Sequence, residues 1–62
     1  MSKPGTVVQA IETFTSTFET YITKGSIYVV QKEGMVQIHY IIDDNGRIAA
    51  FHRDRFKIIL SP

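Results

Sequence analysis

The sequence contains no cysteine and no tryptophan, and only two prolines and four glycines among its 62 residues. Without cysteine the chain has neither a disulfide framework nor a thiolate metal site. Its two histidines, His39 and His52, are far apart in the sequence and have no neighbouring pair of ligands, which is poor spacing for zinc. The composition therefore excludes the cross-links that stabilise many very small domains, and we expect no metal or other cofactor.

Long apolar runs and an excess of one charge are also absent. No run approaches the ~20 apolar residues that a membrane-spanning helix needs. The formal net charge is +1, so overall charge gives no argument for a nucleic-acid or an acidic partner. The first residues lack the apolar stretch of a secretory signal. We therefore expect a cytoplasmic protein that does not bind a membrane.

Apolar residues are nevertheless plentiful, at 44% of the chain, which is typical of a sequence that folds. We expect a disordered lead over residues 1–5 and a single domain over residues 6–61. A domain of this size buries only about 60% of the surface of its unfolded chain. Its stability must come from packing, either within one copy or against a second one, so a homodimer is one expected form.

About five runs rich in β-branched and aromatic residues are expected to be strands. They are Thr6–Glu12, Ser26–Lys32, Met35–Asp43, Arg47–His52 and Phe56–Leu60. Asp43-Asp44-Asn45-Gly46 predicts a tight hairpin turn, because aspartate and asparagine tolerate turn geometry and glycine accepts a positive φ. Short strands joined by tight turns indicate an antiparallel meander, which in so small a chain is usually curled into a barrel.

The alternation within Met35–Asp43 separates two faces of that strand. Val36, Ile38, Tyr40 and Ile42 fall on one face, and Gln37, His39 and Ile41 fall on the other. We expect the first face to be in the core and His39 to point outward.

The first third of the sequence is compatible with two structures. Apolar residues recur there at helical spacing, and Gly25 is placed to end a helix. These residues are Val7, Ile11, Phe14, Phe18, Tyr21 and Ile22. Six threonines within the same segment disfavour a helix, because each is stiff at its β-carbon. Pattern alone leaves open whether Phe14–Lys24 is helical.

Three motifs in the chain resemble a group of small SH3-like proteins, which are common as uncharacterised reading frames of bacteriophages and bacteria. The motifs are Lys24-Gly25-Ser26-Ile27-Tyr28-Val29-Val30, Tyr40-Ile41-Ile42-Asp43-Asp44-Asn45-Gly46 and Phe51-His52-Arg53-Asp54-Arg55-Phe56, preceded by Val8-Gln9-Ala10-Ile11. The resemblance spans nearly all of residues 7–58. It implies an all-β SH3-like barrel and says little about function.

The resemblance also assigns the ambiguous segment. It implies a strand first, then a long hairpin-like loop over Phe14–Lys24 that is comparable to the RT loop, and a second loop over Lys32–Met35. It implies a 3₁₀ turn over Arg53–Arg55 before the last strand. Tyr28, Val30, Ile42 and Phe56 are implied to be core residues. The chain departs from the proline-peptide-binding members, because it has no tryptophan and His52 stands where a proline is common, so we do not expect PxxP recognition.

Nothing in the sequence predicts an enzyme. Asp43 and Asp44 are adjacent carboxylates, which can share a proton or hold a metal, but beside Asn45-Gly46 their ordinary role is to cap a turn. Neither histidine has a serine, cysteine or carboxylate arranged around it.

Two surfaces are candidates for binding. A loop in so small a barrel cannot easily bury three aromatic residues and an isoleucine, so Phe14, Phe18, Tyr21 and Ile22 are the expected contact surface for a protein partner. With the resemblance, they point to a non-enzymatic protein-binding module. Such a module would be a phage or mobile-element accessory protein that binds and modulates a host protein in the host cytoplasm.

The alternative is a nucleic-acid-binding module. Positive charge concentrates in the last quarter of the chain and could neutralise phosphates. These residues are Arg47, His52, Arg53, Arg55 and Lys57. The lysine-glycine pair at Lys24-Gly25, with Gly34 further on, also loosely resembles KOW modules of transcription and translation proteins. We keep this hypothesis as the second one.

Overall fold

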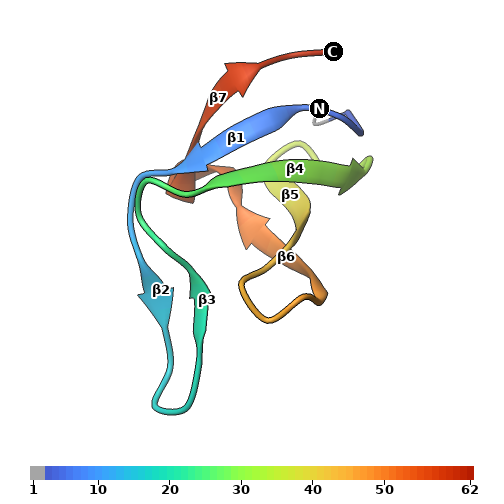
Figure 1. Cartoon of the computed structure of the whole chain (residues 1–62). Coiled ribbons are helices and arrows are strands. Elements are labelled where there is room, and N and C mark those ends of the chain that lie inside the picture. Colours follow the sequence, from blue (N-terminus) through green and yellow to red (C-terminus); the bar gives the residue numbers. More distant parts are fainter. Residues whose placement is uncertain (1–2) are drawn as a thin grey trace.

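The computed structural model describes residues 3–62, which contain seven short strands and one 3₁₀ turn joined by loops (Figure 1). In chain order they are β1 Val7–Ala10, β2 Phe14–Thr15, β3 Thr20–Ile22, β4 Ile27–Lys32, β5 Ile38–Ile42, β6 Ile48–His52, η1 Arg53–Arg55 and β7 Phe56–Leu60. The prediction of an all-β chain with a 3₁₀ turn before the last strand is confirmed.

Five of the strands form one antiparallel sheet in the order β6-β5-β4-β1-β7, and β2 pairs with β3 in a separate hairpin. The long strand β4 takes part in two halves of the sheet, pairing with β1 through Ile27–Val29 and with β5 through Val30 and Lys32. The register shifts between Val30 and Lys32, and such an irregularity bends a strand. The sheet folds there, so that β5 and β6 lie across from β1 (Figure 1).

The predicted barrel is not closed. The edge strands β6 and β7 are consecutive in the chain, yet they pair with β5 and β1 and not with each other. Phe51 on β6 and Phe56 on β7 pack ring to ring between these edges, with 6.3 Å between their centroids. Bulky side chains thus fill the space between the two edges, where hydrogen bonds would have closed the barrel.

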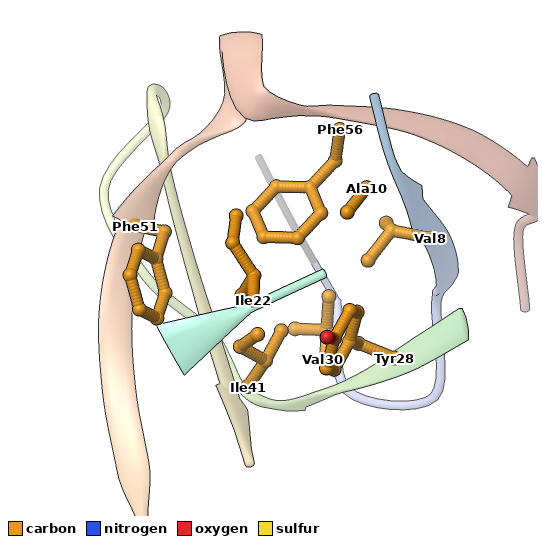
Figure 2. Packing of buried hydrophobic residues seen from close by; sticks show 8 residues of the cluster. All are labelled: Val8, Ala10, Ile22, Tyr28, Val30, Ile41, Phe51 and Phe56. Atoms are coloured by element: carbon orange, nitrogen blue, oxygen red, sulfur yellow. The ribbon is translucent and has the colours of Figure 1, made fainter. Parts of the chain in front are cut away.

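The core lies inside the fold of the sheet, where side chains of six strands meet (Figure 2). Its members are Val8, Ala10, Ile22, Tyr28, Val30, Ile41, Phe51 and Phe56. The expected inward positions of Tyr28, Val30 and Phe56 are confirmed, as is the shared face of Val8 and Ala10.

The predicted face of β5 is wrong. Ile41 is fully buried and Ile42 is 44% exposed, while His39, expected to point outward, is 5% exposed. The alternation separated the two faces of β5 but did not show which one is buried, because each face carries isoleucine. Ile41 lies opposite Val30 of β4, and cross-strand neighbours share a face, so the inward Val30 places Ile41 in the core.

The helical alternative for the first third is excluded, since Phe14–Ile22 forms the β2–β3 hairpin. The threonines that disfavour a helix stabilise its alternative. The Thr15 hydroxyl donates to the Glu19 carbonyl at 2.9 Å, and the Thr13 hydroxyl accepts from the Lys24 amide at 3.0 Å. Side chains that bond the local backbone in this way compete with helical hydrogen bonds.

The described part of the expected lead forms a turn. Lys3–Gly5 form a turn in which the carbonyl of Lys3 accepts from the amide of Thr6 at 3.1 Å. The amide of Gly5 donates to the carbonyl of Val30 at 2.9 Å. Residues 1 and 2, the rest of the expected lead, lie outside the described residues.

Candidate functional site

The tip of the β2–β3 hairpin carries the most exposed large apolar side chain of the described residues. Phe18 is 93% exposed, and the hairpin projects away from the five-stranded sheet (Figure 1). The turn beneath it is closed by the amide of Ser16, which donates to the carbonyl of Glu19 at 2.8 Å. The Ser16 hydroxyl accepts from the amides of Phe18 and Glu19, at 3.3 Å each. The aromatic ring is thus held outward by a hydrogen-bonded turn.

The hairpin is fixed to the turn between β5 and β6. The amide of Asp44 donates to the carbonyl of Tyr21 at 2.8 Å, and the side-chain amide of Asn45 donates to the carbonyl of Thr20 at 3.1 Å. Arg47 forms an ion pair with Glu19. Because these contacts join residues distant in the sequence, they restrict the hairpin to one position on the sheet.

Three aromatic rings form a cluster at the base of the hairpin. Phe14 lies 5.5 Å from Tyr21 and 6.0 Å from Phe51, measured between ring centroids. The guanidinium of Arg55 lies over the outer side of this cluster, 4.3 Å from the centroid of Phe14. Such a cation–π contact places a positive charge against one face of the aromatic cluster.

A shallow groove of about 350 Å³ runs beside this aromatic cluster, between the hairpin and β6. It is lined by Phe14, Glu19, Tyr21, Asp43, Arg47, Ile48, Ala49 and Phe51. The Glu19–Arg47 ion pair lies at its border, and Ile48 is an exposed apolar side chain. The groove thus combines an apolar floor with a charged rim, as protein-binding surfaces commonly do.

The structure brings together two of the four residues expected at the partner surface and places a third on the same hairpin. Phe14 and Tyr21 line the groove, and Phe18 stands at the tip of the hairpin. Ile22 is fully buried among the core residues, so it belongs to the core and not to this surface. The strand alternation within β3 explains the difference, because Tyr21 and Ile22 point to opposite sides.

No sequence pattern predicts the part of this surface that comes from β6. Phe51 and Ile48 lie beside the hairpin because the sheet bends and brings β6 next to it. Nothing in their local sequence distinguishes them from ordinary strand residues.

The basic residues of the last quarter do not act as one free patch. Arg47 is paired with Glu19, and Arg55 with Glu12, with 3.1 Å between the nearest atoms of the latter pair. The hydrogen bond to Glu19 raises the pKa of Arg47. Two of the four arginines and lysines in this set therefore carry an acidic neighbour.

The remaining basic residues are separated by the fold. Lys57 lies opposite Gln9 on the outer face of the sheet. Arg53 belongs to η1, and the His52 ring accepts a hydrogen bond from the amide of Asp54 at 3.2 Å. Neither Arg53 nor Lys57 forms an ion pair within residues 3–62. They are the two cations of this set that remain available.

The adjacent carboxylates Asp43 and Asp44 hold turns together. The Asp43 carboxylate accepts from the amides of Asn45 and Arg47, at 2.9 and 3.1 Å, and Gly46 has a φ of 80°. Asp44 accepts from the hydroxyl of Tyr28 at 2.7 Å. Within the described part of the chain, no group of three or more histidine and acidic side chains is arranged to hold a metal ion.

The outer face of β1, β4 and β7 is the other apolar surface. Ile27, Val29, Ile59 and Leu60 are exposed there or beside it, and Val7 is half-buried. None of these residues lines the aromatic groove beside the hairpin.

No helix in the described residues is both long and apolar enough to cross a membrane. Comparisons of the chain with protein-family models, curated proteins and solved structures find no match.

Proposed function

We propose that this chain is a non-enzymatic protein-binding module that presents the β2–β3 hairpin to a folded protein partner. The observation that carries the proposal is the 93% exposure of Phe18 on a turn that its own hydrogen bonds hold in place. A single exposed ring is common on protein surfaces, but this one stands on a constrained hairpin that also lines an aromatic groove, and such grouped apolar surface favours a role in binding.

The partner is expected to offer a pocket for the ring of Phe18. Aromatic side chains that fill a pocket on the partner commonly dominate the binding energy of an interface. The aromatic groove beside the hairpin would receive apolar side chains around that pocket, and the Glu19–Arg47 pair would form part of the polar rim.

The attachment of the hairpin supports this role energetically. Binding is weakened when flexible segments must be ordered, and a preformed surface avoids that cost. The contacts of Tyr21, Thr20 and Glu19 with the turn between β5 and β6 order the hairpin before any partner arrives.

We also propose that the sheet is of the SH3-like kind. The strand order β6-β5-β4-β1-β7, a hairpin between β1 and β4, and η1 before β7 all support this assignment. The resemblance to small bacteriophage proteins then suggests a host protein, in the host cytoplasm, as the partner that the module modulates.

The ion pairs of Arg47 and Arg55 weigh against the nucleic-acid alternative. Phosphate binding depends on cations that are free to replace the counterions of the nucleic acid. Glu19 and Glu12 would oppose a phosphate near these two arginines.

The proposal can be tested by photocrosslinking in a nuclease-treated bacterial lysate. A benzophenone side chain at position 18 is expected to crosslink one protein in stoichiometric amount. The matched control carries the same group at position 35, where exposed Met35 lies on the connection between β4 and β5. Equal crosslinking from both positions, or none from position 18, would contradict the proposal.

The identified partner then allows a quantitative test. Phe18→Ser is expected to weaken its binding at least tenfold, which corresponds to about 1.4 kcal/mol. Met35→Ser is expected to leave binding unchanged. Light scattering separates a second copy of the chain from a foreign partner, because the monomer has a mass of 7.1 kDa.

A further inference from the structure

A second and larger groove lies at the open end of the sheet, on the side where β1 begins and β7 ends. Its volume is about 690 Å³, within the range of roughly 300–1,000 Å³ that is usual for small-molecule sites. It is lined by Lys3, Thr6, Val36, His39, Arg53, Asp54, Phe56, Ile58, Ser61 and Pro62. None of these residues lines the aromatic groove beside the hairpin.

Two polar residues that the fold largely covers lie in the wall of this groove. Thr6 is 4% exposed and His39 is 5% exposed. Nδ1 of His39 is fully shielded and has no hydrogen-bond partner within the described residues. Buried polar groups are normally hydrogen-bonded, so this imidazole beside the groove points to a ligand.

The imidazole of His39 is suited to donate one hydrogen bond. Burial, and then the positive charge of Arg53, lower its pKa, so the ring is neutral near pH 7. A neutral imidazole has one donor and one acceptor nitrogen. Because Nδ1 is shielded without a partner, a proton on Nε2 avoids a stranded buried N–H group. The Nε2–H group is then the donor that remains for the groove.

The charged rim of the groove favours a single negative charge. Lys3 and Arg53 form no ion pair within the described residues, and Asp54 lies beside them. Two of the lining side chains are cationic and one is anionic, so together these three carry a net charge of +1. A doubly charged phosphate would be repelled more strongly by Asp54 than a singly charged carboxylate. A carboxylate can also accept two parallel hydrogen bonds from the guanidinium group of an arginine.

The remaining walls are apolar. Phe56 and Ile58 come from β7, with Val36 and Pro62 at the sides. A ligand for this groove therefore needs an apolar body next to its charged end.

We propose that this groove binds a carboxylate attached to an apolar body. The carboxylate lies between Lys3 and Arg53 and accepts hydrogen bonds from Thr6 and His39, while the apolar body packs on Phe56 and Ile58. Such a group occurs in free organic acids and at the carboxyl terminus of peptides, and the two sources share this chemistry.

Nuclear magnetic resonance titration of the ¹⁵N-labelled chain tests the proposal and separates the two sources. The probes are 4-phenylbutyrate, its neutral amide, and a tetrapeptide ending in phenylalanine with a free or an amidated carboxyl group. The acids are expected to shift the backbone resonances of Thr6, His39 and Arg53, and the amides are not. A response to phenylbutyrate supports a free organic acid as the source. A response confined to the free-acid peptide supports a peptide terminus.

Arg53→Gln is expected to weaken binding of the responding acid at least tenfold. Lys57→Gln is the matched control, because Lys57 lies on the outer face and outside the groove. Both side chains are exposed, so the variants are expected to keep the spectrum of the folded chain. Equal responses to acid and amide, no response to any probe, or equal weakening by both substitutions would overturn the proposal.

Discussion

The hydroxyl of Tyr28 donates a hydrogen bond of 2.7 Å to Oδ1 of Asp44, which joins strand β4 to the turn between β5 and β6. The same hydroxyl accepts from the amide of Thr23 at 2.9 Å, and the Thr23 hydroxyl donates to Oδ2 of Asp44 at 2.7 Å. These three residues thus connect the end of the hairpin, the core and the turn. Burial of the ring, followed by the bond to Asp44, raises the pKa of Tyr28 above its ordinary value of 10.0.

Removal of this hydroxyl is expected to destabilise the fold. Tyr28→Phe leaves the amide of Thr23 and one oxygen of Asp44 without their partner. We expect the free energy of unfolding to fall by about 1–3 kcal/mol, measured by urea denaturation. The matched control is Tyr40→Phe, because the Tyr40 hydroxyl forms no hydrogen bond among residues 3–62. An equal loss in both variants would contradict the assigned role of the Tyr28 hydroxyl.

The burial of His39 is expected to make the fold sensitive to acid. Its pKa is lowered in the folded chain from 6.5, so the unfolded chain takes up a proton at a higher pH than the folded chain does. The stability is therefore full above pH 6.5 and is lost as the pH falls from there through the folded pKa. Urea denaturation at pH 7.5 and at successively lower pH is expected to give a falling free energy of unfolding.

Substitution of His39 tests the origin of this acid sensitivity. His39→Leu is expected to reduce the dependence on pH, since it removes the titrating ring. At pH 7.5 it is expected to cost little, because Nδ1 has no partner to lose. His52→Gln replaces the other, exposed histidine and should keep the wild-type acid sensitivity. An unchanged pH profile in His39→Leu would show that another group is responsible.

The face of β5 can be tested with two neighbouring isoleucines. Ile41 is fully buried and Ile42 is 44% exposed. Ile41→Val is expected to lower the free energy of unfolding by about 0.5–1.5 kcal/mol through the loss of a buried methylene group. Ile42→Val, the same chemical change on the other face, is expected to stay within about 0.5 kcal/mol of the wild type. The reverse order would indicate that the sequence-based face of β5 was right.

Gly34 is expected to resist substitution because of its close neighbours. A Cβ atom at this position would lie 2.8 Å from Cε2 of Tyr40 and 3.0 Å from the carbonyl oxygen of Ile38. The ring of Tyr40 would have to move, which disturbs its contact with Lys32, whose Nζ lies 4.6 Å from the ring centroid. Gly34→Ala is expected to cost about 1–3 kcal/mol in urea denaturation, as overpacking does.

Two further variants identify the cause of that loss. Glu33→Ala, an exposed neighbour, is expected to change the stability by less than about 0.5 kcal/mol. In a Tyr40→Leu background, Gly34→Ala is expected to cost less, because the ring that it meets is gone. An undiminished cost in that background would place the clash at the backbone of Ile38.

The local features of the fold could be predicted because their causes are local. The turn at Asp43–Gly46 depends on an aspartate side chain that bonds nearby amides and on a glycine with positive φ. The last strand was predicted with its observed bounds, Phe56–Leu60, and the 3₁₀ turn before it followed from the resemblance. The role of the aromatic segment before Lys24 as a binding surface stays a prediction.

Local sequence patterns account for the strand content, the turns and the residue types that are available for binding. The burial of one face of β5, the place of Ile22 in the core, and the ion pairs of Arg47 and Arg55 with Glu19 and Glu12 follow from the tertiary structure. Propensity and turn chemistry act between neighbours in the chain, whereas burial and ion pairing depend on which distant strands the folded sheet brings together. Phe18 remains exposed for the same reason, since no distant strand covers the tip of its hairpin.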